Sequence, residues 1–182
     1  MQTTIRTIIL KPEEIEILKA HRGKLDYTRP ALSCLISVKK GDINYICATD
    51  SHALVAIRLL DCELAPGSWQ ILKITKENKR LSSVMLEFID DQPPDVSYYI
   101  DQFGFSGQRF EITINKKNST GTSSAQIGIY KNTNKAIQYD FIKRLHYPTA
   151  WIYRASCTAH DKVLALTNED PNIQAYILPF KM

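Results

Sequence analysis

The sequence predicts an α+β fold in which antiparallel strands are backed by two helices. Three observations favour this class: β-prone runs dominate the chain, only two segments have helical features, and the order strand, helix, three strands occurs near each end. The two copies share little sequence, so the repeat is one of pattern alone. With 182 residues, of which 44% are apolar, the chain can form one domain with a sizeable core.

The first copy of the pattern is expected within residues 1–66. The opening run MQTTIRTIIL predicts a strand, and residues 10–24 predict a helix. Pro12 suits the first helical turn, and Gly23 suits the C-terminal cap. We therefore expect the chain to begin with a strand followed by a helix.

A hairpin is expected to follow this helix. Residues 31–40 and 43–50 are both rich in β-prone side chains and are separated by Gly41-Asp42. The next run, HALVAIRLL, predicts a third antiparallel strand that completes the first copy.

The second copy of the pattern is expected within residues 109–182. Its helix is predicted within residues 137–148, because Asp140 is a suitable N-cap and Phe141 and Leu145 share a helical face. The polar run at residues 117–124 predicts a flexible loop. Further strands are expected at residues 69–74, 83–89, 109–116, 125–130, 150–156, 162–167 and 175–181.

The middle of the chain fits neither copy well. Residues 67–108 contain Pro93-Pro94 and several aspartates, which favour a connecting or inserted segment. We therefore predict one domain over residues 1–182, made of two halves and this segment.

The sequence lacks the motifs of common enzyme classes. It has no G-x-G-x-x-G, P-loop, H-E-x-x-H or G-x-S-x-G pattern, and its four cysteines form no C-x-x-C pair. Asp50, Ser51 and His52 are consecutive, but neighbouring strand residues point to opposite faces and cannot form a triad among themselves. An enzyme acting through His52 or the acidic stretch Asp90–Asp95 is the less favoured alternative. We expect no catalytic residue, no metal site and no cofactor.

Charge and hydropathy limit the location and the partners that we expect for this protein. No run approaches the roughly 20 apolar residues of a spanning helix, and the N-terminus has no small-residue cleavage site. We therefore expect a cytoplasmic protein without membrane contact. The net charge of +4 permits an acidic partner without requiring one.

Five basic residues occur in the two expected helices. Lys19, Arg22 and Lys24 are near the end of the first helix, and Lys143 and Arg144 are in the second. If both helices cover one face of a sheet, these charges form a common surface that attracts a phosphate backbone without reading bases. The alternative is a pair of solvated helix ends whose cations favour the helix dipole.

Three stretches make the sequence similar to the bacterial DNA polymerase III beta subunit, the sliding clamp. ALSCLISVKKGDINYICATDSHALVAIRL resembles the central-domain pattern that leads into ATDGHRLA, with Ser51 in place of glycine and Ala53 in place of arginine. The C-terminus AYILPFKM resembles the clamp ending AYVVMPMRL, and residues 90–100 resemble a linker between clamp domains. The resemblance implies a DNA-clamp-like (βαβββ)₂ domain.

The resemblance also implies two binding surfaces. One is a hydrophobic cleft for short linear peptides of replication proteins, with cleft residues at Thr49, Ser51, His52, Leu54, Leu178, Pro179 and Phe180. The other faces duplex DNA without sequence preference, and its residues are Lys19, Arg22, Lys24, Lys143 and Arg144.

Two functions follow from these surfaces. The first is a processivity factor-type role in DNA replication, in which one domain per chain implies a homo-oligomeric ring of about six chains. The alternative is a monomeric peptide-binding adaptor or regulator that does not encircle DNA.

Overall fold

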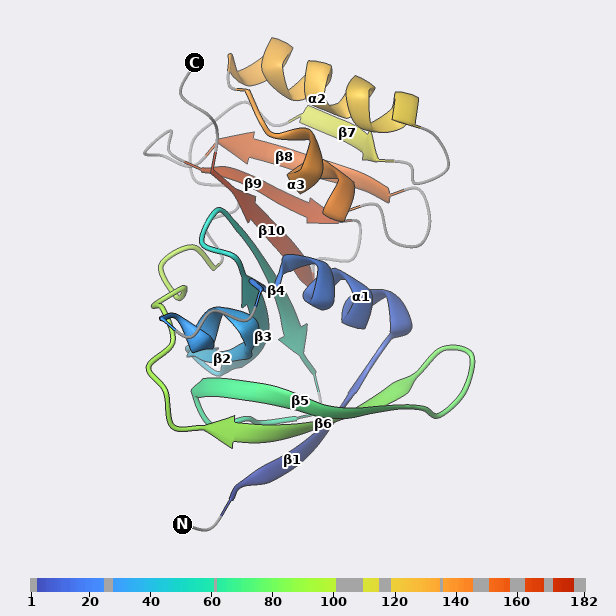
Figure 1. The fold of residues 1–182 in the computed structure, drawn as a ribbon. Helices are drawn as coiled ribbons and strands as arrows, with labels where there is room; N and C mark the ends of the chain where they lie inside the picture. Colours follow the sequence, from blue (N-terminus) through green and yellow to red (C-terminus); the bar gives the residue numbers. More distant parts are fainter. Residues whose placement is uncertain are drawn as a thin grey trace. The chain divides into compact units, whose positions relative to one another are not determined.

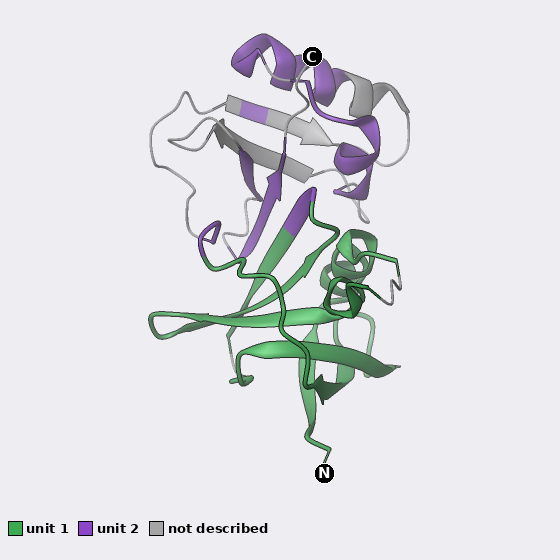
Figure 2. Cartoon of the chain, turned by 60° about the vertical axis from the view of Figure 1, so that its left-hand side comes forward, with its two compact units in different colours: residues 1–51, 55–97 green, residues 52–54, 98–182 purple. Residues whose placement is uncertain are grey.

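The structure is a computed structural model, and it describes most of the chain. The described residues are 3–24, 28–60, 62–100, 110–114, 119–134, 136–145, 151–157, 163–168 and 172–178. The chain divides into two compact units, residues 1–51 with 55–97 and residues 52–54 with 98–182 (Figure 2). Both units combine helices with antiparallel strand pairs, which confirms the predicted α+β class.

The first unit contains a sheet and the helix α1 (Figure 1). Its elements are β1 (Ile5–Leu10), α1 (Pro12–His21), the 3₁₀ turn η1 (Pro30–Ser33), β2 (Leu35–Lys40), β3 (Ile43–Thr49), β4 (Ala53–Leu59), β5 (Gly67–Lys76) and β6 (Ser82–Ile89). The strands follow the order β1-β6-β5-β2-β3-β4. The first two residues of β4 belong to the second unit.

Helix α1 forms where the sequence predicts it. Pro12 occupies the first helical turn, and the Lys11 backbone N–H donates a hydrogen bond of 2.7 Å to Glu14 Oε2. Ile15 and Leu18 are buried, so the helix packs through an apolar face.

The predicted glycine cap of α1 is wrong. Helix α1 ends in extended backbone at Arg22, and Gly23 does not have the positive φ of a left-handed cap. Glycine is instead needed for close approach, because a Cβ at position 23 would lie 3.0 Å from the Leu32 Cβ. The Gly23 N–H also donates to the Leu32 carbonyl at 2.8 Å.

The predicted hairpin of β2 and β3 is confirmed. The two strands are antiparallel, with Lys40 opposite Ile43, and Gly41 adopts a φ of 60° in the connecting turn. Strand β2 begins later than predicted, because residues 30–33 form the 3₁₀ turn after Pro30 fixes its first residue.

Residues 67–97 contribute two strands to the first unit's sheet. Strand β5 pairs with β2 through residues 67–69 and with β6 along most of its length. Trp69 of β5 is only 1% exposed and packs edge-on against Phe88 of β6, at 5.3 Å between ring centroids. The segment expected to connect the two copies therefore carries part of the first unit's core.

The second unit contains four strands and two helices among its described residues. They are β7 (Phe110–Ile114), α2 (Ser119–Thr133), α3 (Tyr139–Arg144), β8 (Trp151–Cys157), β9 (Leu164–Asn168) and β10 (Ile173–Ile177). The strands follow the order β10-β9-β8-β7, and each neighbouring pair is antiparallel. Strand β10 is buried at all five of its positions.

The predicted loop at residues 117–124 and strand at residues 125–130 are wrong. Residues 119–133 form helix α2. The run Ala-Gln-Ile-Gly-Ile-Tyr alternates like a strand, but burial follows helical spacing: Ala125 and Ile129 are buried, whereas Ile127 is 54% exposed.

Helix α3 is shorter than predicted. It covers residues 139–144 of the predicted range 137–148, and its N-cap is Gln138. Asp140 is therefore in the first turn, where its negative charge favours the helix N-terminus without capping it. Phe141 and Leu145 are buried as expected.

Candidate functional site

The motif segment after β3 forms a tight turn at Ser51. This residue adopts a φ of 73°, which is uncommon for a residue with a side chain. Its N–H donates to Thr49 Oγ1 at 3.0 Å, and its hydroxyl donates to the Asp50 carbonyl. The clamp motif has glycine here, and glycine adopts this conformation without steric cost. Ser51 therefore adopts a backbone conformation that costs glycine less than serine.

The motif segment and the C-terminal segment meet at a backbone hydrogen bond. The Leu178 N–H donates to the His52 carbonyl at 2.9 Å, and both residues belong to the second unit. The side chain of Leu178 is 39% exposed, and His52 is also exposed. Leu54 differs, because it is only 5% exposed and packs internally. One residue from each predicted part of the cleft, His52 and Leu178, is thus in contact with the other within the second unit.

Helix α3 adds an aromatic residue that the sequence did not single out as a binding residue. The rings of His52 and Phe141 are stacked, with 6.2 Å between centroids and 17° between planes. The Arg144 guanidinium lies 5.0 Å from the centroid of the Phe141 ring, a cation–π distance. The helical spacing of Phe141 and Leu145 was the available signal, but by itself it predicts only a core contact.

The predicted DNA-facing residues are divided between the two units. Lys19, Arg22 and Lys24 lie at the end of α1 in the first unit, and Lys143 and Arg144 lie in α3 of the second. A common basic surface therefore stays a prediction.

The cations near the end of α1 differ in their surroundings. Lys19 Nζ pairs with Glu16 Oε1 at 3.2 Å, so part of its charge is neutralised. Arg22 is partly buried, and Lys24 is exposed. Lys19 and Lys24 are thus both exposed, and among the described residues Lys24 has no ion pair like that of Lys19.

The remaining predicted site residues are Pro179 and Phe180. Both lie outside the described residues.

The acidic stretch has a structural explanation. Asp95 Oδ1 accepts hydrogen bonds from the Ser97 N–H at 3.0 Å and the Ser97 hydroxyl at 2.6 Å. These two bonds lower the pKa of the Asp95 carboxyl.

Among the described residues, no group of three His, Cys, Asp or Glu side chains could hold a metal ion. In that part of the chain, no helix is long and apolar enough to cross a membrane.

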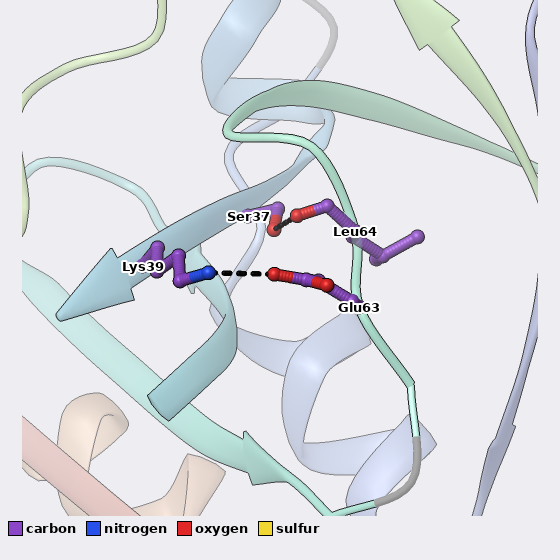
Figure 3. Close-up of polar contacts among 4 residues, drawn as sticks. All are labelled: Ser37, Lys39, Glu63 and Leu64. Carbon is purple, nitrogen blue, oxygen red and sulfur yellow. Dashed lines mark hydrogen bonds and ion pairs between the residues drawn. The ribbon is translucent and has the colours of Figure 1, made fainter. Parts of the chain in front are cut away.

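A second polar cluster ties the segment after β4 to β2 (Figure 3). Ser37 Oγ donates to the Leu64 carbonyl at 3.3 Å, and Lys39 Nζ pairs with Glu63 Oε1 at 2.6 Å. This contact raises the pKa of Lys39 and lowers that of Glu63. Glu63 also lines an open pocket of 390 Å³ beside Arg58. The pair is exposed, so it holds a surface segment and is not a buried functional pair.

The fold matches solved sliding clamps. The DNA polymerase III beta subunit from Borrelia burgdorferi is 10% identical, with a TM-score of 0.57 over 97% of this chain and 64% of that chain. The sliding clamp from Bacillus subtilis is 14% identical, with a TM-score of 0.51 over 97% and 64% of the two chains. The Helicobacter pylori beta clamp bound to a DNA ligase peptide is 11% identical, with a TM-score of 0.53 over 100% and 67%.

These structural matches cover nearly the whole chain, whereas the sequence resemblance rests on three short stretches. No family model and no curated protein matches the sequence. The chain spans 64% of the length of the Borrelia and Bacillus structures. It therefore has the sliding clamp fold across nearly all of its own length, at very low sequence identity.

Proposed function

We propose that this chain is a non-enzymatic, cytoplasmic DNA sliding-clamp-like protein with a processivity factor-type role in replication, and that it binds short peptides beside His52 and Leu178. The observation that carries the proposal is the hydrogen bond between these two residues within a sliding clamp fold. It joins the two sequence segments that resemble the clamp's peptide-binding cleft.

The surroundings of this hydrogen bond suit an apolar peptide. Leu178 offers an exposed apolar side chain, while His52 stacks on Phe141 and offers an aromatic face with a polar edge. We assign Thr49, Ser51 and Leu54 to the support of this surface, and Pro179 and Phe180 to its continuation along the chain. One similar clamp was solved with a DNA ligase peptide, which supports a peptide as the ligand class.

Fluorescence anisotropy with a labelled copy of that DNA ligase peptide tests the cleft. Leu178→Ala should weaken binding about tenfold, the effect of losing about 1.4 kcal/mol at a contact buried on binding. Leu81→Ala is the matched control, since Leu81 is 41% exposed and Leu178 is 39% exposed. His52→Ala should also weaken binding. If both cleft variants bind as the parent protein does, the cleft proposal is wrong.

Duplex DNA is the second proposed partner. In this proposal Lys19, Arg22, Lys24, Lys143 and Arg144 attract the phosphate backbone, and a ring of chains retains the DNA topologically. Replacing the exposed Lys24 and Lys143 by glutamate, together with Lys19, should reduce retention on closed circular DNA. Retention equal to that of the parent protein would refute this role for the helices.

The alternative is a monomeric peptide-binding adaptor or regulator of replication proteins. Light scattering over a concentration series separates the two proposals, because a closed ring requires a discrete oligomer of about six chains. A monomer at all concentrations that still binds the peptide would favour the adaptor.

A further inference from the structure

The β5–β6 hairpin contains a dense group of cations. Lys73, Lys76, Lys79 and Arg80 occur within residues 73–81, where Glu77 is the one carboxylate. This short segment has a net charge of +3, against +4 for the whole chain. The net charge of the protein is therefore concentrated largely in one hairpin.

The hairpin extends beyond its neighbouring strands. Strand β2 pairs with β5 only through residues 67–69, so residues 70–76 are paired on one side, by β6, among the described residues. Figure 1 shows the loop joining β5 and β6 (green) reaching past the neighbouring strands of the first unit. All four cationic residues are exposed. The tip is thus a two-stranded ribbon whose charges face water.

The turn of the ribbon has a defined backbone. Asn78 Oδ1 accepts hydrogen bonds from the N–H groups of Arg80 at 2.8 Å and Leu81 at 2.9 Å. The Glu77 N–H donates to the Leu81 carbonyl at 3.1 Å, and Glu77 Oε1 accepts a bond from the Ser83 hydroxyl at 2.6 Å. The tip therefore presents its cations on an ordered turn and loses less entropy on binding.

The hairpin cations are not neutralised by neighbouring carboxylates. Lys11, Lys19 and Lys39 of the same unit pair with Glu14, Glu16 and Glu63. Within the described part of the chain, the four hairpin cations form no such pair. A polyanion can therefore approach the hairpin without first displacing an internal ion pair.

We infer that the β5–β6 hairpin is a second contact for the phosphate backbone of duplex DNA, separate from the helix residues. A two-stranded ribbon fits the major groove of B-DNA, and its lysines and arginine would contact phosphates without reading sequence. This inference rests on the DNA-binding part of the proposed function and adds an element to it. It predicts binding to short linear DNA, which needs no ring.

The test measures binding to a labelled linear duplex of random sequence as the salt concentration is raised. A hairpin variant replaces Lys76, Lys79 and Arg80 by alanine. If all three contact phosphates, the slope of log K against log salt should become shallower by about 2.7, since each phosphate contact contributes about 0.9. Circular dichroism checks that the variant is folded.

A control variant replaces Lys11, Lys39 and Lys131 by alanine. These lysines are exposed and lie outside the hairpin, and the variant has the same change in net charge. We expect its slope to equal that of the parent protein. If the slope becomes shallower by the same amount in both variants, binding depends on net charge alone and the inference is overturned.

A third variant, Lys19→Ala with Lys24→Ala and Lys143→Ala, separates this inference from the proposed function. If this helix variant loses DNA affinity and the hairpin variant does not, the hairpin contact is overturned and the proposed DNA surface on the helices stands. If the parent protein does not bind the linear duplex, the hairpin contact is refuted, whereas retention on closed circular DNA still tests the proposed ring. If the hairpin variant loses affinity for phosphatidylserine vesicles but not for DNA, a membrane surface is the partner and the inference is wrong.

Discussion

Ile129 and Ile127 of α2 allow a direct test of the helix that replaces the predicted loop and strand. Ile129 is fully buried, whereas Ile127 is 54% exposed. Replacing a buried isoleucine by alanine costs about 2–5 kcal/mol, because apolar contacts are lost and a cavity forms. Alanine regains about 0.5 kcal/mol through its higher helix propensity. We therefore expect Ile129→Ala to lower the free energy of unfolding by about 3 kcal/mol.

Ile127→Ala is the matched control in the same helix. About half of this side chain is already in water, so its lost burial of about 0.5–1 kcal/mol is offset by the gain in helix propensity. Urea unfolding followed by far-UV circular dichroism measures both variants. With a slope of about 2 kcal/mol per molar urea, the midpoint should fall by about 1.5 M for Ile129→Ala and by less than about 0.3 M for Ile127→Ala. Equal shifts would refute the helix, since a strand would place both side chains on one face.

Three further outcomes test the backbone and the thiols. Ser51→Gly should raise the free energy of unfolding by up to about 1 kcal/mol by relieving the φ of 73°, and a loss of stability would contradict the strain. Gly67→Ala should lower the free energy of unfolding by about 1–3 kcal/mol. Gly67 has a φ of 141°, and the new Cβ would lie 2.6 Å from Phe88 Cε2. An unchanged thermal unfolding would disprove the clash. In a Cys157→Ser variant, Ellman's reagent at pH 8 should label Cys62 before Cys47. The reason is that complete burial raises the pKa of Cys47 far above that of a free thiol. Faster labelling of Cys47 would show that this thiol is accessible.

Much of the first unit was predictable because its signals are local. The turn at Gly41, the β-prone runs on each side and Pro12 before an amphipathic segment each act within a few residues. The resemblance to the sliding clamp rested on equally short motifs, and the fold comparisons confirm it. At Ser51 the structure shows a positive φ, a conformation that glycine adopts without steric cost.

The sequence therefore determined the fold class, most strands and two of the helices, while the binding role of the two motif segments stays a prediction. Tertiary packing decided the helix at residues 119–133, where the alternating run could form either a strand or a helix until Ala125 and Ile129 were buried together. It also decided the hydrogen bond between Leu178 and His52. Local propensity acts over a few residues. These outcomes depend instead on burial and hydrogen bonding between residues far apart in the chain, and a local sequence pattern does not specify which distant residues meet.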